Sequence, residues 1–507
     1  MPDSNPPLGS RVFSGVEANL LGQAVLLGIN LWLTPRLIRG FGTDGYGVFT
    51  LIWTSLSCLY LLTLGTNMAT QKFAAHYQGR GEPASLSRTL RGSLLFNAAV
   101  GLAGFCLLWL VHGWVSGRML QTHPAMRADA RHVLACAALA APAYFLTLFS
   151  VDVCFGLQRF RAANVLLTLH WTGPAVAAAA LLRAGLGLHE VGTAFAVFQW
   201  ALAAAALLSV RTPLLAAASG GDGGELREYF RFALKNFASQ AVWVFTFQVD
   251  RLLIARLLPL TDLGYYSNAS SIAQKLNGLC GSIGQAAFPL YAELHGTEQG
   301  ERLRRFYLRS SQLYLFLILP LSVLTWVLAP QFFTLWIDSE FSVRATWPVR
   351  LLVLGNLGYL ACSLANTLAS GKGLPQAGAF LQAGRTAALL ALWLLLIPRW
   401  GMAGAALAFL LAQCLGAPPF VGYVHKRLLG VTWGVYWRES CMRPALAAGV
   451  LAAFGLLTHA WVASWPSFLA YGAFSMALYY GVGYRLLDAD ARAALRGWAQ
   501  GRLAYFQ

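Results

Sequence analysis

Runs of about twenty apolar residues recur along the whole chain, and they restrict what it can fold into. The 507 residues are 57% hydrophobic and only 11% charged, which is too apolar for a soluble globule. Each run is long enough to cross a hydrocarbon core about 30 Å thick. Because lipid offers no hydrogen bonds to the backbone, such runs must be helices. The sequence therefore predicts an all-α polytopic membrane protein with about 14 transmembrane helices. The predicted spans are 16–38, 46–69, 92–115, 133–156, 163–182, 190–210, 233–257, 264–291, 310–330, 347–370, 378–397, 401–424, 443–463 and 467–487.

A short repeat indicates that the chain is built from two related halves. The pattern Asn-x-x-x-Gln-Ala-Val begins at Asn19 and again at Asn236, and a Thr-Asp turn follows each copy, at Thr43 and at Thr261. An even number of intervening spans would make the halves parallel repeats, as in many transporters. Chance similarity between two apolar helices is the alternative, because the match is short.

A glycine-rich stretch marks the boundary between these halves. Residues 219–224 read Ser-Gly-Gly-Asp-Gly-Gly, a composition typical of a flexible linker. The predicted parts are two six-helix bundles followed by two additional helices and an amphipathic tail. Their boundaries are 1–218 for the first bundle, 219–232 for a cytoplasmic linker, 233–425 for the second bundle and 426–507 for the remainder.

The positive charges predict the orientation in the membrane. The net charge is +17, and most Arg and Lys residues fall in alternate loops when the N-terminus is cytoplasmic. The longest of these inner segments are 71–91 and 211–231. Both termini are then cytoplasmic, and the first apolar run is too long to be the core of a signal peptide. This distribution also makes a nucleic-acid partner an unnecessary explanation for the charge.

Motifs for catalysis or metal binding are missing from the sequence. It contains no H-E-x-x-H, G-x-S-x-G or P-loop pattern. The nine His and eight Cys are scattered without ligand spacing. We therefore expect no catalytic residues, no metal site and no cofactor, and a protein that is not an enzyme.

Polar residues form stripes along several spans, which favours a hydrated lining. At about 100° per residue, Asn236, Gln240, Asp250 and Arg251 share one face of span seven. Gln274 and Lys275 share a face of the next span with several serines, and Gln23 and Asn30 take the equivalent positions in span one. Such amides could bind sugar hydroxyls, or they could form the hydrogen bonds between helices that are their commoner use.

Charged side chains within spans are the strongest candidates for function, because burying a charge in lipid costs about 2.5 to 3.5 kcal/mol. We expect Arg251, Lys275 and Arg36 to hold an anionic group such as a pyrophosphate. Asp250 and Glu17 are candidates for taking up a coupling H⁺ or Na⁺. The structural alternative is that Asp250 and a neighbouring cation form a buried ion pair that fixes helix register.

Three segments of the sequence resemble the polysaccharide transporter family, which includes bacterial O-antigen and exopolysaccharide flippases. They are Arg36 to Gly47 (R-L-I-R-G-F-G-T-D-G-Y-G), Gly156 to Phe160 (G-L-Q-R-F), and Asp250-Arg251 with the following L-G-Y-Y and F-P. The family belongs to the multidrug/oligosaccharidyl-lipid/polysaccharide superfamily. The resemblance covers spans one to twelve, and the last two spans match the longer members.

The resemblance implies two six-helix bundles around a central cavity and a place in the bacterial inner membrane. The cargo would be an oligosaccharide on undecaprenyl pyrophosphate, moved from the cytoplasmic to the periplasmic leaflet by alternating access. A polysaccharide polymerase and export machinery would be partners.

Two other functions remain open at this point. A cation-coupled drug exporter of the same superfamily would need an acidic cavity. A membrane-embedded glycosyl- or acyltransferase would need clustered catalytic residues.

Overall fold

The computed structural model describes most of the chain. The described residues are 8–119, 126–215, 224–276, 291, 300–372, 374–486 and 492. Side chains are described for these residues except at 8–24, 27, 118–119, 238–239, 243, 371 and 375–377. In this part of the chain, nine helices are long and apolar enough to cross a membrane. The predicted fold class, an all-α polytopic membrane protein, is confirmed.

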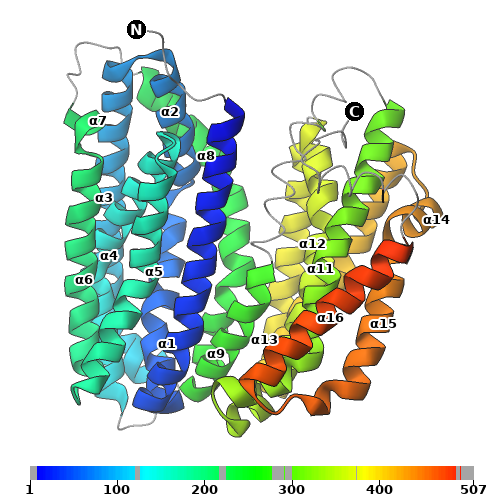
Figure 1. Cartoon of the computed structure of the whole chain (residues 1–507). Coiled ribbons are helices and arrows are strands. Elements are labelled where there is room, and N and C mark those ends of the chain that lie inside the picture. The colour runs from blue at the N-terminus through cyan, green and yellow to red at the C-terminus, as the bar shows by residue number, and fades with distance from the viewer. Residues whose placement is uncertain are drawn as a thin grey trace. The chain divides into compact units, whose positions relative to one another are not determined.

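Packing divides the chain into two compact units, Met1–Gly264 and Tyr265–Gln507 (Figure 1). The boundary lies after α8 (Gly224–Phe247) and α9 (Val249–Leu257), because both helices pack on the helices that precede them. α8 already begins at Gly224, within the range predicted as linker. The bundle boundaries read from the sequence stay a prediction.

Unit 1 is an antiparallel array of long helices. The helices of unit 1 are α1 (Leu8–Leu59), η1 (Tyr60–Thr63), α2 (Thr66–Arg80), α3 (Pro83–Trp114), η2 (Val115–Met119), α4 (Arg127–Gly156), α5 (Phe160–Arg183), α6 (Leu188–Ser209), α7 (Arg211–Leu215), α8 (Gly224–Phe247) and α9 (Val249–Leu257). α1 holds the first two predicted spans, with a kink at Gly42 where φ is 71°. A left-handed residue favours glycine, so the predicted turn between these spans is explained by its sequence.

The predicted inner segment 71–91 is almost entirely helical. α2 runs to Arg80, and α3 begins at Pro83, where a proline is well tolerated in the first turn of a helix. Gly81, with φ at 67°, ends α2 in the left-handed region. The span that precedes this segment is interrupted instead at Leu64 and Gly65, both with positive φ.

Buried hydroxyl groups join three helices of unit 1. The side chains of Thr70 on α2, Ser93 on α3 and Tyr229 on α8 lie 2.8 to 2.9 Å apart and form a closed triangle of hydrogen bonds. Aromatic and small residues surround this triangle. Because each hydroxyl can both donate and accept, the triangle satisfies these buried groups internally.

The two Thr-Asp turns of the proposed repeat meet within unit 1. The Thr261 hydroxyl donates a hydrogen bond to the Asp44 carboxylate. Gly47 allows this approach, since a Cβ there would lie 2.2 Å from the carbonyl oxygen of Leu260. The contact joins the two segments that the sequence marked as equivalent.

Unit 2 begins at Tyr265, within a helical segment described over residues 260–276, and then continues through long helices. These are α11 (Gly300–Trp336), α12 (Ser339–Gly371), α13 (Pro375–Val424), η4 (His425–Leu429), α14 (Trp433–Tyr436), η5 (Trp437–Cys441), α15 (Met442–Thr458), η6 (His459–Trp461) and α16 (Trp465–Leu486). α13 contains predicted spans eleven and twelve, separated by a kink at Gly401 with φ at 57°. α15 and α16 pack on α11 through Phe316, Leu451 and Tyr479.

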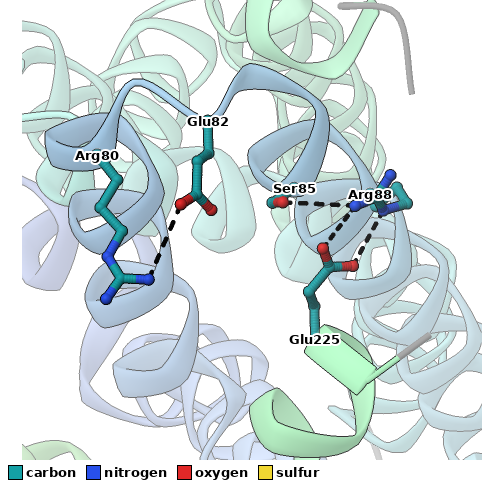
Figure 2. A network of polar contacts seen from close by, with 5 residues as sticks. All are labelled: Arg80, Glu82, Ser85, Arg88 and Glu225. Atoms are coloured by element: carbon teal, nitrogen blue, oxygen red, sulfur yellow. Dashed lines mark hydrogen bonds and ion pairs between the residues drawn. The ribbon is translucent and has the colours of Figure 1, made fainter. Parts of the chain in front are cut away.

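Two ion pairs near the ends of α2, α3 and α8 differ in their geometry and in their exposure to solvent (Figure 2). Arg88 holds Glu225 through two nitrogens, at 3.0 and 2.5 Å, and each side chain is 21% exposed. Arg80 reaches Glu82 at 3.8 Å, with the side chains 61% and 42% exposed. Only the first pair has the bidentate, half-buried geometry that stabilises a fold measurably.

We predict that Glu225→Gln lowers the free energy of unfolding by about 1 to 2 kcal/mol at pH 7, whereas Glu82→Gln changes it little. The hydrogen bonds from Arg88 lower the pKa of the Glu225 carboxyl. The stabilisation is therefore complete above the ordinary carboxyl pKa and is lost as pH falls through the lowered one. Thermal unfolding in detergent between pH 3 and 8 measures both effects, and equal stability of the two variants at pH 7 would contradict this account.

Candidate functional site

The predicted amides of α8 are used in different ways. Gln240 donates from Nε2 to the carbonyl oxygen of Tyr60 at 2.7 Å and to the hydroxyl of Thr63 at 2.6 Å. It thereby satisfies groups that the helix break after Tyr60 leaves without regular partners. Among the described residues, Asn236 donates to the carbonyl oxygen of Phe232, on its own helix. Gln240 thus serves the packing of unit 1, while Asn236 keeps its carbonyl oxygen for other partners.

On α1, Asn30 and Arg36 both bind their own helix. The Asn30 amide donates to the carbonyl oxygen of Leu26 at 2.7 Å. The Arg36 guanidinium donates to the carbonyl oxygen of Trp32 and stacks 3.8 Å from the centre of its ring, with the side chain exposed. The side chains of Gln23 and Glu17 lie outside the described residues.

Asp250 and Arg251 lie at the start of α9, after a helix break at Gln248. Asp250 is 4% exposed and its carboxylate accepts the backbone N–H of Arg251 at 2.8 Å. An acidic side chain in the first turn of a helix also interacts favourably with the helix dipole. Asp250 therefore has a clear structural role at this terminus. The Arg251 Nε is buried without a hydrogen bond.

In unit 2, the predicted stripe of the 260–276 segment is split between two environments. Ser267 is buried, whereas Ser271 and Lys275 are exposed on the same side of the helix. Gln274 donates to the hydroxyl of Ser270 at 2.8 Å. The predicted site residues are thus divided between the two units. Gln274 and Lys275 belong to unit 2, and the other described site residues belong to unit 1.

Arg385 on α13 is a buried cation that was not among the predicted site residues. The residue is 4% exposed, its guanidinium lies 5.4 Å from the ring centre of Tyr359, and its Nε and Nη2 have no hydrogen bond. Gly416 makes room for it, since a Cβ there would lie 2.3 Å from the Arg385 side chain. A lone Arg in an apolar run was the signal in the sequence that could have identified it.

Four cations in spans have no acidic partner among the residues that the structure describes. Among the described residues, no ion pair is formed by Arg36, Arg251, Lys275 or Arg385. A buried ion pair that only fixes helix register would have required one.

An open pocket of about 520 Å³ lies within unit 1, and the sequence did not predict it. It forms where α2, the turn from α4 to α5, and α8 come together. The lining residues are Met68, Gln71, Lys72, Ala75, Phe155, Gly156, Gln158, Phe160, Phe232 and Asn236. Only Asn236 among them was a predicted site residue.

Two family models match neighbouring parts of the chain. The model described as "Polysaccharide biosynthesis protein" matches residues 175–344, and the model described as MatE matches residues 25–169. The chain is also 22% identical over 368 residues to the "Uncharacterized membrane protein EpsK" of Bacillus subtilis (strain 168), and the match covers 69% of each protein.

Solved structures share the fold. One is titled lipid II flippase MurJ in an inward closed conformation, with a TM-score of 0.69 and 12% identity over 93% of this chain and 99% of that one. Another is an inward-facing multidrug resistance MATE family transporter of the MOP superfamily, with a TM-score of 0.68 and 13% identity over 79% and 94%. The family models and these likenesses agree with the resemblance that the motifs predicted. The chain is thus similar over residues 25–169 and 175–344 to two family models, and it shares the fold of a solved transporter of the MOP superfamily.

Proposed function

We propose that the protein is a flippase that moves an undecaprenyl-pyrophosphate-linked oligosaccharide from the cytoplasmic to the periplasmic leaflet by alternating access. The observation that carries this proposal is the set of cations in spans that have no acidic partner among the described residues. Keeping a charge in the membrane is costly, so such residues mark substrate pathways by default. Cations in spans that lack an acidic partner among the described residues are suited to binding an anionic cargo.

The relatives favour a lipid-linked sugar as this cargo. The family model for residues 175–344 carries the description of a polysaccharide biosynthesis protein, and one structural neighbour is a lipid II flippase. In this proposal, Arg251, Lys275 and Arg36 bind the pyrophosphate, and Gln240, Asn236, Gln23, Asn30 and Gln274 contact the head group.

The cell biology follows from the same proposal. In this proposal both termini lie in the cytoplasm of a bacterium and the protein lies in its inner membrane, an orientation that the Arg- and Lys-rich inner segments favour. A polysaccharide polymerase and the export machinery would then receive the flipped molecule on the periplasmic side.

A cation-coupled small-molecule exporter is the second candidate, favoured by the MATE neighbours and by Asp250, an acid buried within a predicted span. In either case Asp250, with Glu17, is the candidate group for taking up H⁺ or Na⁺.

We predict that replacing Arg251 and Lys275 together by Ala reduces translocation of a fluorescent lipid-linked sugar in proteoliposomes by at least about tenfold. Each substitution removes a charge-assisted contact with the cargo that is worth roughly 1.5 to 3 kcal/mol. The matched control is Arg256→Ala, an exposed cation on α9. Unchanged translocation in the double variant would refute the assignment of these residues, and transport of cationic drugs in place of the sugar would refute the cargo.

We predict that Asp250→Asn still translocates the lipid-linked sugar. A proton or sodium gradient, however, no longer accelerates this translocation. The amide keeps the size of the side chain and can still accept the Arg251 N–H, while it cannot release a proton or bind a cation by charge. Asp129→Asn in the first turn of α4 serves as the control. Gradient dependence that survives Asp250→Asn would rule out Asp250 as the coupling group.

A further inference from the structure

The motif Gly156 to Phe160, which belongs to the family resemblance, forms the turn between α4 and α5 and one wall of the pocket in unit 1. Gln158 adopts a left-handed conformation with φ at 58°, which is uncommon outside glycine. Its N–H and that of Arg159 donate to the carbonyl oxygens of Phe155 and Cys154 and close the end of α4. The turn is therefore a defined structure that sets Gln158 in the pocket wall.

Close packing fixes this turn against α2. A Cβ on Gly156 would lie 2.6 Å from the Cβ of Ala74 and 2.8 Å from the carbonyl oxygen of Gln71, so only glycine fits without displacement. The Gln71 amide donates to the carboxylate of Asp152 at 2.9 Å, which ties α2 to α4 a second time. The packing of Gly156 and the hydrogen bond from Gln71 to Asp152 thus both fix the backbone that carries the lining residues.

The charge in the pocket lining belongs to Lys72. Its ammonium lies 4.0 Å from the ring centre of Phe232 and 4.9 Å from that of Phe73, and it forms no ion pair with a described residue. Aromatic faces stabilise an exposed ammonium by only about 0.5 to 1 kcal/mol, so its charge is available to an anion. The nearby exposed cations Arg159, Arg231 and Lys235 add to the positive potential at this end of the unit.

Amide groups and rings supply the other half of the recognition chemistry. Gln71 and Asn236 each donate an amide N–H to a protein acceptor, and their side-chain carbonyl oxygens accept no hydrogen bond from a described residue. The Gln158 side chain has no hydrogen bond to a described residue. Amides of this kind suit sugar hydroxyls, which both donate and accept. Phe155, Phe160 and Phe232 offer flat apolar surfaces on which the C–H face of a sugar ring can pack. A volume of about 520 Å³ is within the usual range for a site of this kind.

We propose that this pocket binds the sugar-phosphate head group of the lipid-linked cargo before translocation, with Lys72 on the phosphate and the amides and rings on the first sugar. The inference rests on the proposed function. The orientation set by the positive charges places the pocket on the cytoplasmic side, where the head group is first encountered.

The test measures how purified full-length protein in detergent retains undecaprenyl pyrophosphate carrying N-acetylglucosamine, by native mass spectrometry. Lys72→Ala should weaken retention about tenfold or more, since a charged contact is lost, and Lys72→Arg should restore most of it. Asn236→Ala should weaken retention of this probe while leaving that of undecaprenyl pyrophosphate unchanged. Arg80→Ala, an exposed cation on α2 outside the pocket, is the matched control and should bind as the wild type does.

The outcomes separate this inference from the proposed function. If the wild type retains none of the probe, both the proposed function and the assignment of the pocket are overturned. If the wild type binds but Lys72→Ala equals Arg80→Ala, the pocket assignment alone is overturned. Displacement of the probe by an equal concentration of phosphatidylglycerol would make the pocket a general acidic-lipid site and would overturn the sugar part of the assignment.

Discussion

The cost of placing polar groups in hydrocarbon governs this molecule at every level. It makes the backbone helical, because each N–H and carbonyl must find a partner within its own segment. It also explains why a helix break is accompanied by a side chain that repairs it. At the break after Tyr60, the Gln240 amide binds the freed carbonyl oxygen and the Thr63 hydroxyl.

The same cost separates structural polar groups from functional ones. The hydroxyls of Thr70, Ser93 and Tyr229 satisfy one another, so they stabilise unit 1 and leave nothing for a ligand. Arg385 differs from them, because two of its nitrogens have no hydrogen bond to a described residue although the side chain is buried. A group that the fold leaves unsatisfied is one that a cargo or water must satisfy.

The sequence predicted the features that depend on local composition. Apolar length predicted the spans, and the glycines at 42 and 401 lie where the structure breaks two merged helices. The sequence did not show that the inner segment 71–91 is mostly helical, because its helices are held by packing of α2 against α4 and α8. Polarity in a transporter does not distinguish a loop from a helix that extends beyond the membrane.

The candidate site was less accessible to sequence reasoning. Helical periodicity correctly placed Asn236 and Gln240 on one face, but it could not show that Gln240 donates to a distant turn while Asn236 lines a pocket. The pocket itself depends on three segments that are far apart in the chain, and on Gly156, whose small size lets two helices touch. Such a site arises from packing, and no single stretch of sequence encodes it.

The central claim is that unpaired cations in the spans serve an anionic lipid head group. The most direct measurement compares, in the same proteoliposomes, the translocation of one sugar attached to undecaprenyl pyrophosphate and to a neutral polyprenyl ether. The account predicts rapid turnover of the pyrophosphate form and little of the neutral one. Equal rates for the two would contradict it.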